Sequence, residues 1–290
     1  MDLLRGLPKY LEPIYDKFHD SNHELYLVGG SVRNLILKRE IKDWDFTTNA
    51  TPEQILKLFP NAFYDNQFGT VGIPIEENSS KKSVVEITTF RSESEYQDGR
   101  HPKTVTWGKS IEEDLKRRDF TINAIALKIS GLGNKPAMNQ SDLIDPFDGI
   151  KDIDKKIIRA VGNPKERFKE DALRLLRAIR IATEHSFTIE ENTWKEIQKD
   201  APLIANISGE RIRIELLRIL TTDYAYGGIM LLKDANLLNY ILPELIEGAG
   251  ISQKRPGRHH VDDVFTHNIL SLKFCPSTDP IVRFATLLHD

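Results

Sequence analysis

The chain has 290 residues, of which 40% are hydrophobic and 29% are charged, and its formal net charge at pH 7 is −3. This length and apolar content predict about two domains with buried cores, and the small negative charge excludes a globally basic protein, so any RNA contact must come from local clusters. The single cysteine, Cys275, excludes a disulfide scaffold, and no apolar run is long enough for a signal peptide or a membrane span, which predicts a soluble cytoplasmic protein.

The first chemical signal is a glycine turn between a strand and a helix. Leu25–Val28 is predicted to form a short buried strand, Gly29 and Gly30 break it, and a helix is predicted to begin at Ser31. Such a turn exposes backbone N–H groups at the positive end of the helix dipole, which suits a phosphate, and Arg33 adds a charge-assisted contact to a triphosphate. The alternative is an ordinary strand-to-helix turn without a ligand.

Two aspartates follow in the segment Lys42-Asp-Trp-Asp-Phe46. In the strand predicted over Trp44–Thr47, a side-chain period of two places Asp43 and Asp45 on one face. Neighbouring carboxylates repel each other unless a cation lies between them, and a pair of Mg²⁺ ions is what in-line nucleotidyl transfer requires. The pair therefore predicts a metal site, and the alternative is two solvated acids on an edge strand.

A third carboxylate belongs to a later strand candidate. Glu86 is the acidic residue of the strand candidate Val84–Phe90. If this strand neighbours the one with the aspartates, Glu86 would lie beside them. If it lies at the sheet edge, Glu86 would be a surface acid, and both interpretations remain open. A polar hairpin loop is predicted at Asn78–Ser83. The other strand candidates of this half of the chain are Gly69–Ile75, Thr104–Trp107 and Ala124–Ile129.

A polar cluster follows a predicted helix start. Ser110-Ile-Glu-Glu113 has a capping-box pattern, and the segment after it embeds Arg118, Asp119 and Asn123 among apolar residues. Polar groups held against a core usually have partners, and we expect these to be a sugar hydroxyl and phosphates. The alternative, a basic helix end with a local Asp cap, explains Asp119 but not Asn123.

Helical periodicity dominates after about residue 150, with one more strand candidate at Ile157–Val161. Asn163-Pro164 predicts a helix start, and Glu170–Ala182 predicts a helix in which Asp171 lies one helical step from Arg174. Ordinarily this arrangement is a solvated, salt-bridged face. The predicted apolar stripe consists of Ala172, Leu175, Leu176, Ile179 and Ala182, and the opposite arc carries Arg174, Arg177 and Arg180.

An Asp/Arg pair also has a sharper interpretation. A carboxylate only accepts hydrogen bonds and a guanidinium only donates them, so the two side by side match a base edge that presents a donor next to an acceptor. Cytosine and adenine have that edge, whereas uracil and guanine present the reverse order. Asp171 with Arg174 could therefore select CTP and ATP without a template.

Together these segments resemble the bacterial class II tRNA nucleotidyltransferase (CCA-adding) and poly(A) polymerase family. The resemblance implies an α+β fold: a polymerase-β-like nucleotidyltransferase head with a mixed sheet over residues 1–150, and an all-helical neck and body over residues 151–245. The matching motifs, in the family's order, are Val28-Gly-Gly-Ser-Val-Arg-Asn34, Asp43-Trp-Asp45, Arg117-Arg-Asp-Phe-Thr-Ile-Asn-Ala124, Asp145-Pro-Phe-Asp-Gly149, Glu170-Asp-Ala-Leu-Arg174 and Ser208-Gly-Glu-Arg-Ile-Arg213.

The resemblance implies a role for each matching position, with the 3′ end of tRNA, CTP and ATP as partners. Asp43 and Asp45 would ligate two Mg²⁺ ions, and Glu86 stays the candidate third catalytic carboxylate. The nucleotide would be held by Gly29, Gly30, Ser31, Arg33, Arg118, Asp119, Asn123, Asp171, Arg174 and Arg177. Candidates for the tRNA backbone are Arg211, Arg213, Arg218, Lys254 and Arg255, although Arg211 and Arg213 equally suit bracing of the neck helix through carboxylates such as Glu215.

The chain departs from the family at a few positions. Asn34 stands where the family commonly has Asp, and Trp44 replaces an aliphatic residue. Poly(A) polymerases of the family tend to show an Arg-Arg-Phe run that this chain lacks, whereas Tyr96–Pro102 resembles the flexible loop of CCA-adding enzymes. These features favour full CCA addition over CC-only addition or poly(A) synthesis.

The last residues carry a second resemblance. Arg258–His267 and the closing His289-Asp290 resemble the opening of an HD-type metal phosphohydrolase domain over residues 246–290, although His259 and His260 could also be a polar loop. Because a further expected ligand is missing, we expect no hydrolase activity here and a longer natural chain. An HD phosphohydrolase and a non-catalytic RNA-binding fragment remain the alternatives from other classes, and no pattern indicates an oligomeric state.

Overall fold

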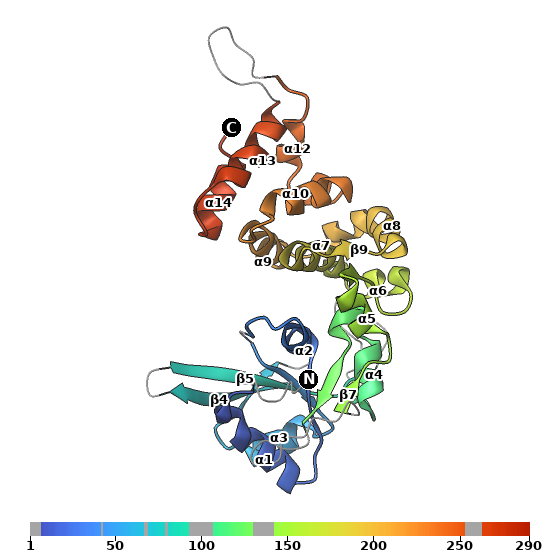
Figure 1. Cartoon of the computed structure of the whole chain (residues 1–290), viewed down its shortest axis with the longest axis vertical. Coiled ribbons are helices and arrows are strands. Elements are labelled where there is room, and N and C mark those ends of the chain that lie inside the picture. Colours follow the sequence, from blue (N-terminus) through green and yellow to red (C-terminus); the bar gives the residue numbers. More distant parts are fainter. Residues whose placement is uncertain are drawn as a thin grey trace. The chain divides into compact units, whose positions relative to one another are not determined.

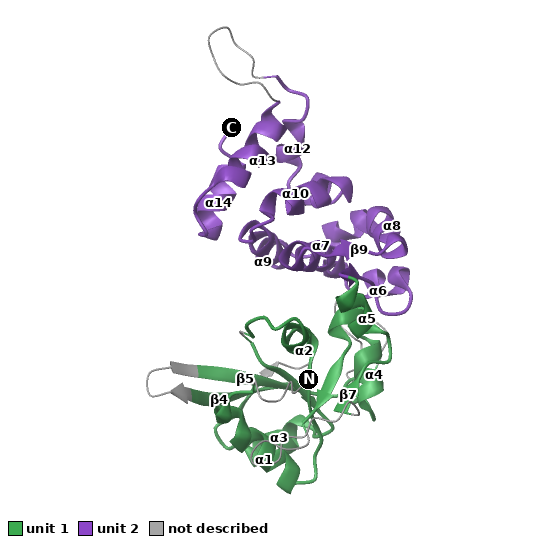
Figure 2. Ribbon diagram, in the orientation of Figure 1, with its two compact units in different colours: residues 1–155 green, residues 156–290 purple. Residues whose placement is uncertain are grey.

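The computed structural model of the chain divides into two compact units, residues 1–155 and 156–290 (Figure 2). The second unit contains both the expected neck and body and the expected HD-like region, so the domain boundaries at residues 150 and 245 stay predictions. No helix in the described part of the chain has the length and apolar character needed to cross a membrane. The structure describes residues 7–41, 43–66, 69–78, 81–92, 107–129, 142–252 and 263–290.

The first unit is built on a mixed seven-stranded sheet with the order β3-β4-β5-β2-β1-β6-β7. The pair β2 and β5 is parallel, and the other pairs are antiparallel. This confirms the mixed sheet predicted for the head. The strands are β1 (Leu25–Val28), β2 (Asp45–Thr48), β3 (Phe63–Asn66), β4 (Thr70–Asn78), β5 (Lys81–Thr89), β6 (Ala126–Lys128) and β7 (Leu143–Ile144).

Helices cover both faces of this sheet. In Figure 1, α2 (Gly29–Ile36) lies on one side of it, and α1 (Glu12–Asp20) and α3 (Pro52–Leu58) lie on the other. All four residues of β1 are buried, as expected for a strand covered on both faces. The remaining helical elements of the unit are η2 (Lys9–Leu11), α4 (Ile111–Lys116), η3 (Thr121–Asn123) and α5 (Gly149–Asp154).

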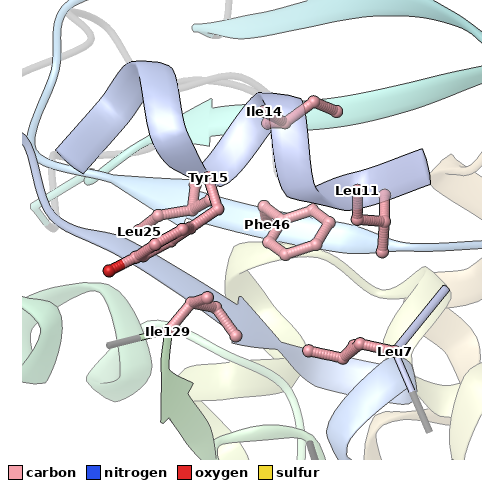
Figure 3. Close-up of a pocket in the computed structure, with 7 residues that line it drawn as sticks. All are labelled: Leu7, Leu11, Ile14, Tyr15, Leu25, Phe46 and Ile129. Carbon is pink, nitrogen blue, oxygen red and sulfur yellow. The ribbon is translucent and has the colours of Figure 1, made fainter. Parts of the chain in front are cut away.

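The core under α1 is tightly packed. The side chains of η2, α1, β1 and β2 meet in a narrow apolar crevice that has no room for a water molecule (Figure 3). The Tyr15 hydroxyl is the one polar side-chain group that Figure 3 draws there, so the crevice belongs to the core and not to a ligand site. Its lining residues are Leu7, Leu11, Ile14, Tyr15, Leu25, Phe46 and Ile129.

Local sequence signals account for most of these elements. The predicted hairpin is confirmed, but the predicted loop over Asn78–Ser83 is too long. The strands β4 and β5 pair antiparallel from Thr70↔Thr88 to Asn78↔Lys81, and residues 79 and 80 lie outside the described ranges. The Ser110 hydroxyl accepts a hydrogen bond from the Glu113 N–H, which confirms the start of α4. In the strand candidate Thr104–Trp107, only Trp107 is described, and it forms an isolated bridge with Arg91. The strands β3 and β7 and the helices α1 and α3 were not predicted.

In its described residues, the second unit is helical apart from a short parallel pair of strands, β8 (Ile157–Ile158) and β9 (Thr188–Ile189), and an isolated bridge between Ser252 and Asp263. Asn163 caps α6, as predicted, by accepting a hydrogen bond from the Lys165 N–H. The predicted apolar stripe is buried, with exposed fractions of 6% or less. The helices are α6 (Pro164–Glu170), α7 (Leu173–His185), α8 (Glu191–Asp200), α9 (Gly209–Leu220), α10 (Ala225–Asp234), α11 (Leu238–Ile241), α12 (Pro243–Glu247), α13 (Val264–Phe274) and α14 (Pro280–Leu287), with a 3-10 segment η5 (Ala201–Asn206).

A glycine joins α5 to η3 in the first unit. A Cβ atom at Gly149 would lie 2.2 Å from the Thr121 carbonyl oxygen, closer than any real contact allows. Asp145 caps the same helix end by accepting hydrogen bonds from the N–H groups of Gly149 and Ile150, and the Thr121 hydroxyl donates to Asp152 over 2.7 Å. This joint fixes η3, which follows the Arg118-Asp119 segment.

The substitution Gly149→Ala is expected to lower the free energy of unfolding by about 1–3 kcal/mol, because the added methyl group must push η3 and α5 apart. Chemical denaturation would measure the loss. The matched control is Gly227→Ala in α10, where a Cβ atom meets nothing within 4 Å, and where alanine in a helix stabilises by roughly 0.5–1 kcal/mol. Equal stability of Gly149→Ala and the unsubstituted chain would contradict the close approach.

Candidate active site

The two aspartates of the predicted metal site are joined by a serine hydroxyl. The Ser31 Oγ donates to the Asp43 carbonyl oxygen over 2.9 Å and accepts from the Asp45 N–H over 3.1 Å. The prediction that strand alternation places both aspartates is wrong, because β2 begins only at Asp45 and its pairing with β1 ends at Leu27↔Phe46. The serine of α2, and not the sheet ladder, fixes the backbone between Asp43 and Asp45.

The glycine turn differs in detail from its prediction. The helix α2 begins at Gly29 with Val28 as its N-cap, so Ser31 lies inside the first turn and not at its start. Gly29 has φ +65°, a conformation that favours glycine. A Cβ atom at Gly29 would lie 3.1 Å from Arg118 Nη1 and 3.7 Å from Asp45 Oδ2. The turn therefore brings three predicted site residues together: Gly29, Asp45 and Arg118.

Glu86 lies next to Asp45 in the sheet. The parallel strands β2 and β5 pair Asp45 with Glu86 in register, and residues paired in a ladder point to the same face. Phe46 and Ile87, the next pair, are buried on the opposite face with exposed fractions of 4% and 0%. The sheet therefore places Glu86 beside Asp45, and its role as a third carboxylate stays a prediction.

Two arginines converge on one buried carboxylate. Asp114 is fully buried; its Oδ1 accepts from Arg117 Nε and Nη2 over 3.1 and 2.7 Å, and its Oδ2 accepts from Arg118 Nε and Nη2 over 3.3 and 2.9 Å. Burial raises the pKa of Asp114, but the charges and hydrogen bonds of Arg117 and Arg118 outweigh it and hold that pKa far below 3.8. Sequence reasoning missed Asp114, although its spacing of three and four residues from the arginines is readable on a helix.

A second polar network surrounds Arg33. Arg33 is 8% exposed, and its guanidinium donates to Asn123 Oδ1 over 2.6 Å and to Asn34 Oδ1 over 3.2 and 3.3 Å. Asn123 in turn donates to Asp119 Oδ1 over 3.1 Å. The network connects α2 to η3, so three of the predicted nucleotide-binding residues lie in one buried chain of hydrogen bonds. The contact of Arg33 with a triphosphate stays a prediction.

The aspartate predicted to read the base has an unexpected partner. Asp171 accepts from Arg211 Nη1 and Nη2 over 3.2 and 2.7 Å and from the Leu173 N–H over 3.1 Å. Arg174 donates to Glu170 over 2.6 Å. The predicted helix over Glu170–Ala182, with Asp171 one step from Arg174 inside it, is wrong in this detail. Asp171 has an extended backbone, with φ −151° and ψ 104°, and separates α6 from α7.

The other arginines of this unit differ in exposure. Arg180, expected on a solvated face, is 6% exposed and donates to Glu215 and Glu184. Arg177 is half-buried, Arg213 is exposed, and Arg218 lies 3.4 Å from Glu184. Their predicted contacts with nucleotide or tRNA stay predictions. The candidates Lys254 and Arg255 and the loop Tyr96–Pro102 lie outside the described residues.

A histidine and carboxylate cluster occurs near the end of the chain. His267 of α13 lies 3.1 Å from His289 and 3.3 Å from Asp290, measured between ring nitrogens and from nitrogen to carboxylate oxygen. One ligand atom from each of the three lies within 4.8 Å of the others, a spacing that suits a metal ion. The cluster contains the described histidines of the HD-like motif together with Asp290, and His259 and His260 lie outside the described ranges.

Two family models match the chain. The one described as "Poly A polymerase head domain" matches residues 25–159, and the one described as "Probable RNA and SrmB- binding site of polymerase A" matches residues 186–248. The first match contains the aspartates, Glu86 and the arginine pair, and the second contains Arg211, Arg213 and Arg218.

Curated relatives are CCA-adding enzymes. The chain is 42% identical over 245 residues to the one from Enterococcus faecalis, covering 84% of this chain and 56% of that protein. It is 40% identical over 220 residues to the one from Geobacillus kaustophilus, covering 76% of this chain and 51% of that protein. The chain thus spans about half the length of the curated relatives it matches.

Solved structures show the same fold. The CCA-adding enzyme of Bacillus stearothermophilus in complex with CTP gives a TM-score of 0.71 at 30% identity, over 97% of this chain and 69% of that one. A tRNA nucleotidyltransferase complexed with a primer tRNA and an incoming ATP analog gives 0.68 at 25% identity, over 94% and 74%. The predicted fold class, a mixed-sheet nucleotidyltransferase head followed by a helical neck and body, is confirmed.

The substitution Ser31→Ala is expected to lower the free energy of unfolding by about 1–3 kcal/mol, because it removes two hydrogen bonds and leaves the Asp45 N–H without its partner. Urea denaturation would measure it. Ser208→Ala is the control, since Ser208 is exposed and makes no side-chain cap hydrogen bond to α9. If both variants lose the same small amount of stability, Ser31 does not fix the aspartates.

Proposed function

We propose, since this chain belongs to the tRNA nucleotidyltransferase and poly(A) polymerase family, that it adds cytidine and adenosine to the 3′ end of tRNA from CTP and ATP without a template. The observation that carries the proposal is the acidic site of the head, where Ser31 holds Asp43 to Asp45 and the sheet sets Glu86 beside Asp45. A tRNA substrate implies that the activity is cytoplasmic.

The proposed reaction is an in-line displacement at phosphorus. The 3′-hydroxyl oxygen of the RNA attacks the α-phosphorus of the nucleotide, the bond to the β-phosphate bridging oxygen breaks, and pyrophosphate leaves. Two Mg²⁺ ions bound there would lower the pKa of the hydroxyl and neutralise the triphosphate charge. Asp43 and Asp45, with Glu86 as a third ligand, would supply the carboxylate oxygens that Mg²⁺ prefers.

The other head residues would position the nucleotide. The Gly29 turn offers backbone N–H groups at the start of α2, and Arg118 lies against that turn, so both suit the phosphates. Asp119 and Asn123 suit a ribose hydroxyl, since the Asp119 carboxylate accepts hydrogen bonds and the Asn123 amide can both donate and accept them. Catalysis of this kind is mostly positioning and electrostatic stabilisation.

The second unit would select the base. The Oδ2 of Asp171 accepts one hydrogen bond, from Arg211, while Oδ1 accepts two. Each carboxylate oxygen has two lone pairs, so Oδ2 retains capacity for the amino group of cytosine or adenine. Arg174, with Arg177 beside it on α7, would donate to the ring nitrogen. Arg213 and Arg218 would contact the RNA backbone.

A primer-extension assay on tRNA lacking its 3′ end tests the function. With Mg²⁺, CTP and ATP, growth by three nucleotides that requires both substrates is expected. Asp43→Ala should abolish the transfer while leaving tRNA binding nearly unchanged, because it removes a metal ligand and no RNA contact. A variant that still extends RNA would contradict the assignment of Asp43.

The other outcomes of the same assay identify the alternatives. Two added cytidines would indicate a CC-adding enzyme, and a long ladder with ATP alone would indicate a poly(A) polymerase. Release of phosphate from nucleotides that is unaffected by Asp43→Ala would assign the activity to the cluster of His267, His289 and Asp290, as in an HD phosphohydrolase. tRNA binding without any transfer would leave only a binding module.

A second prediction concerns the base. Asp171→Ala should relax the preference for CTP and ATP over UTP and GTP by roughly 5- to 100-fold, the size of a well-placed hydrogen-bonded base contact. Single-nucleotide incorporation with each of the four substrates would measure it. Asp200→Asn, another carboxylate of this unit buried at a helix end, is the control for a general loss of stability. Unchanged selectivity of Asp171→Ala would refute the base-reading role.

A further inference from the structure

Arg117 and Arg118, which follow α4, both donate to Asp114 through their Nε and Nη2 atoms. Asp114 engages the Nε and Nη2 edge of Arg118, and the Nη1 atom of that guanidinium is left over. Among the residues the structure describes, Asp114 is the one hydrogen-bond partner of the Arg118 side chain. One edge of Arg118 is thus fixed and the other is available.

The available edge lies at the glycine turn. The 3.1 Å between Arg118 Nη1 and a Cβ atom built on Gly29 means that the guanidinium passes directly over this residue, and Asp45 Oδ2 lies 3.7 Å from the same point. A side chain at Gly29 would require the Arg118 guanidinium to shift by a few tenths of an ångström. The arginine therefore reaches the place where the turn presents its backbone N–H groups, next to an aspartate of the proposed metal site.

The charge of the cluster suits an anion. The Arg118 guanidinium is positively charged at neutral pH, and the Arg117 and Arg118 side chains are each 19% exposed while that of Asp114 is 0% exposed. The low pKa of Asp114 keeps its carboxylate ionised at neutral pH. The Arg91 N–H also donates to Asp114 Oδ1, over 3.3 Å, so the carboxylate is held from the β5 side as well. The Asp114 carboxylate is therefore buried and held in place, and the exposed surface of the cluster belongs to the two arginines.

We propose that Asp114 is a positioning residue for the nucleotide triphosphate, which fixes one edge of Arg118 so that Nη1 is presented to the phosphates at the Gly29 turn. The proposal rests on the proposed function and deepens it by assigning a residue that does not itself touch the substrate. A guanidinium held in place in advance loses less side-chain entropy on binding than a free one.

The alternative is that Asp114 only stabilises α4. The two roles differ in their effect on the binding of the β- and γ-phosphates. A structural residue affects all nucleotides alike, whereas a residue that acts through Arg118 affects CTP and not CMP, which lacks the β- and γ-phosphates. The ratio of the dissociation constants of CMP and CTP is therefore the quantity that separates them.

The experiment measures the binding of CTP and CMP, with Mg²⁺, to the full chain and to Asp114→Asn, Arg118→Ala and the double variant. Asp114→Asn should weaken CTP binding by about 10-fold, the value of one charge-assisted hydrogen bond, and leave CMP binding unchanged. The double variant should bind CTP no more weakly than Arg118→Ala alone. Asp152→Asn, which removes the charge of another buried carboxylate of this unit, is the control and should keep the CMP to CTP ratio.

Several outcomes would overturn the proposal. Equal weakening of CTP and CMP by Asp114→Asn would leave only the structural role, and so would losses that add in the double variant. If Asp114→Asn fails to fold, Arg118→Lys is the deciding variant, because a lysine keeps the charge but cannot hold Asp114 and reach the phosphates together. The ratio of the CMP and CTP dissociation constants must then fall. An unchanged ratio refutes the proposal. If the full chain extends tRNA but Asp114→Asn keeps the CMP to CTP ratio of the dissociation constants, this inference alone is overturned. If the full chain neither extends tRNA nor prefers CTP to CMP, the proposed function is overturned too.

Discussion

The parallel pairing of β2 with β5 is the constraint on which the acidic site of the head depends. The register Asp45↔Glu86 sets two carboxylates side by side on one face while Phe46 and Ile87 enter the core on the other. A shift of one residue would turn Glu86 into the core and Ile87 toward the site, which the burial of an unpaired charge makes very costly. The hydrophobic residues of β5 therefore determine where the acid lies.

The parallel pairing of β2 and β5 also requires a crossover connection between the two strands. Parallel strands cannot be joined by a tight turn, so the chain between Thr48 and Lys81 has to return to the end of the sheet where it started. The segments α3, β3 and β4 make that return, and α3 is started by a capping box of Thr51 and Gln54. The site is thus built from two strands that are neighbours in space but separated by a helix and two strands in sequence.

Local patterns in the sequence predicted the individual helices and strands better than the long-range contacts between them. The strand β1, the β4–β5 hairpin and the starts of α4 and α6 follow from short-range signals, and the structure contains them. The prediction that strand alternation places Asp43 was wrong because Ser31, not the sheet, holds its backbone. Asp171 was misplaced because the helix pattern of Glu170–Ala182 continues across a break, and its partner Arg211 lies 40 residues away. A pairing across such a distance depends on how helices pack, which no local spacing records.

The same long-range ion pairs explain why α7 is a rigid support for Asp171. Arg180 lies on α7 with an exposed fraction of 6%, and it joins Glu184 on the same helix to Glu215 on α9. Arg211, on the same α9 and one helical turn before Glu215, joins that helix to Asp171 at the start of α7. The two contacts join the first half of α9 to Arg180 of α7 and to Asp171 just before α7, and removal of one partner of the buried pair would leave an uncompensated charge. The Asp171 carboxylate is therefore held by Arg211 of α9, a helix that is itself joined to α7, and this limits the rotamers of the carboxylate before any ligand is bound.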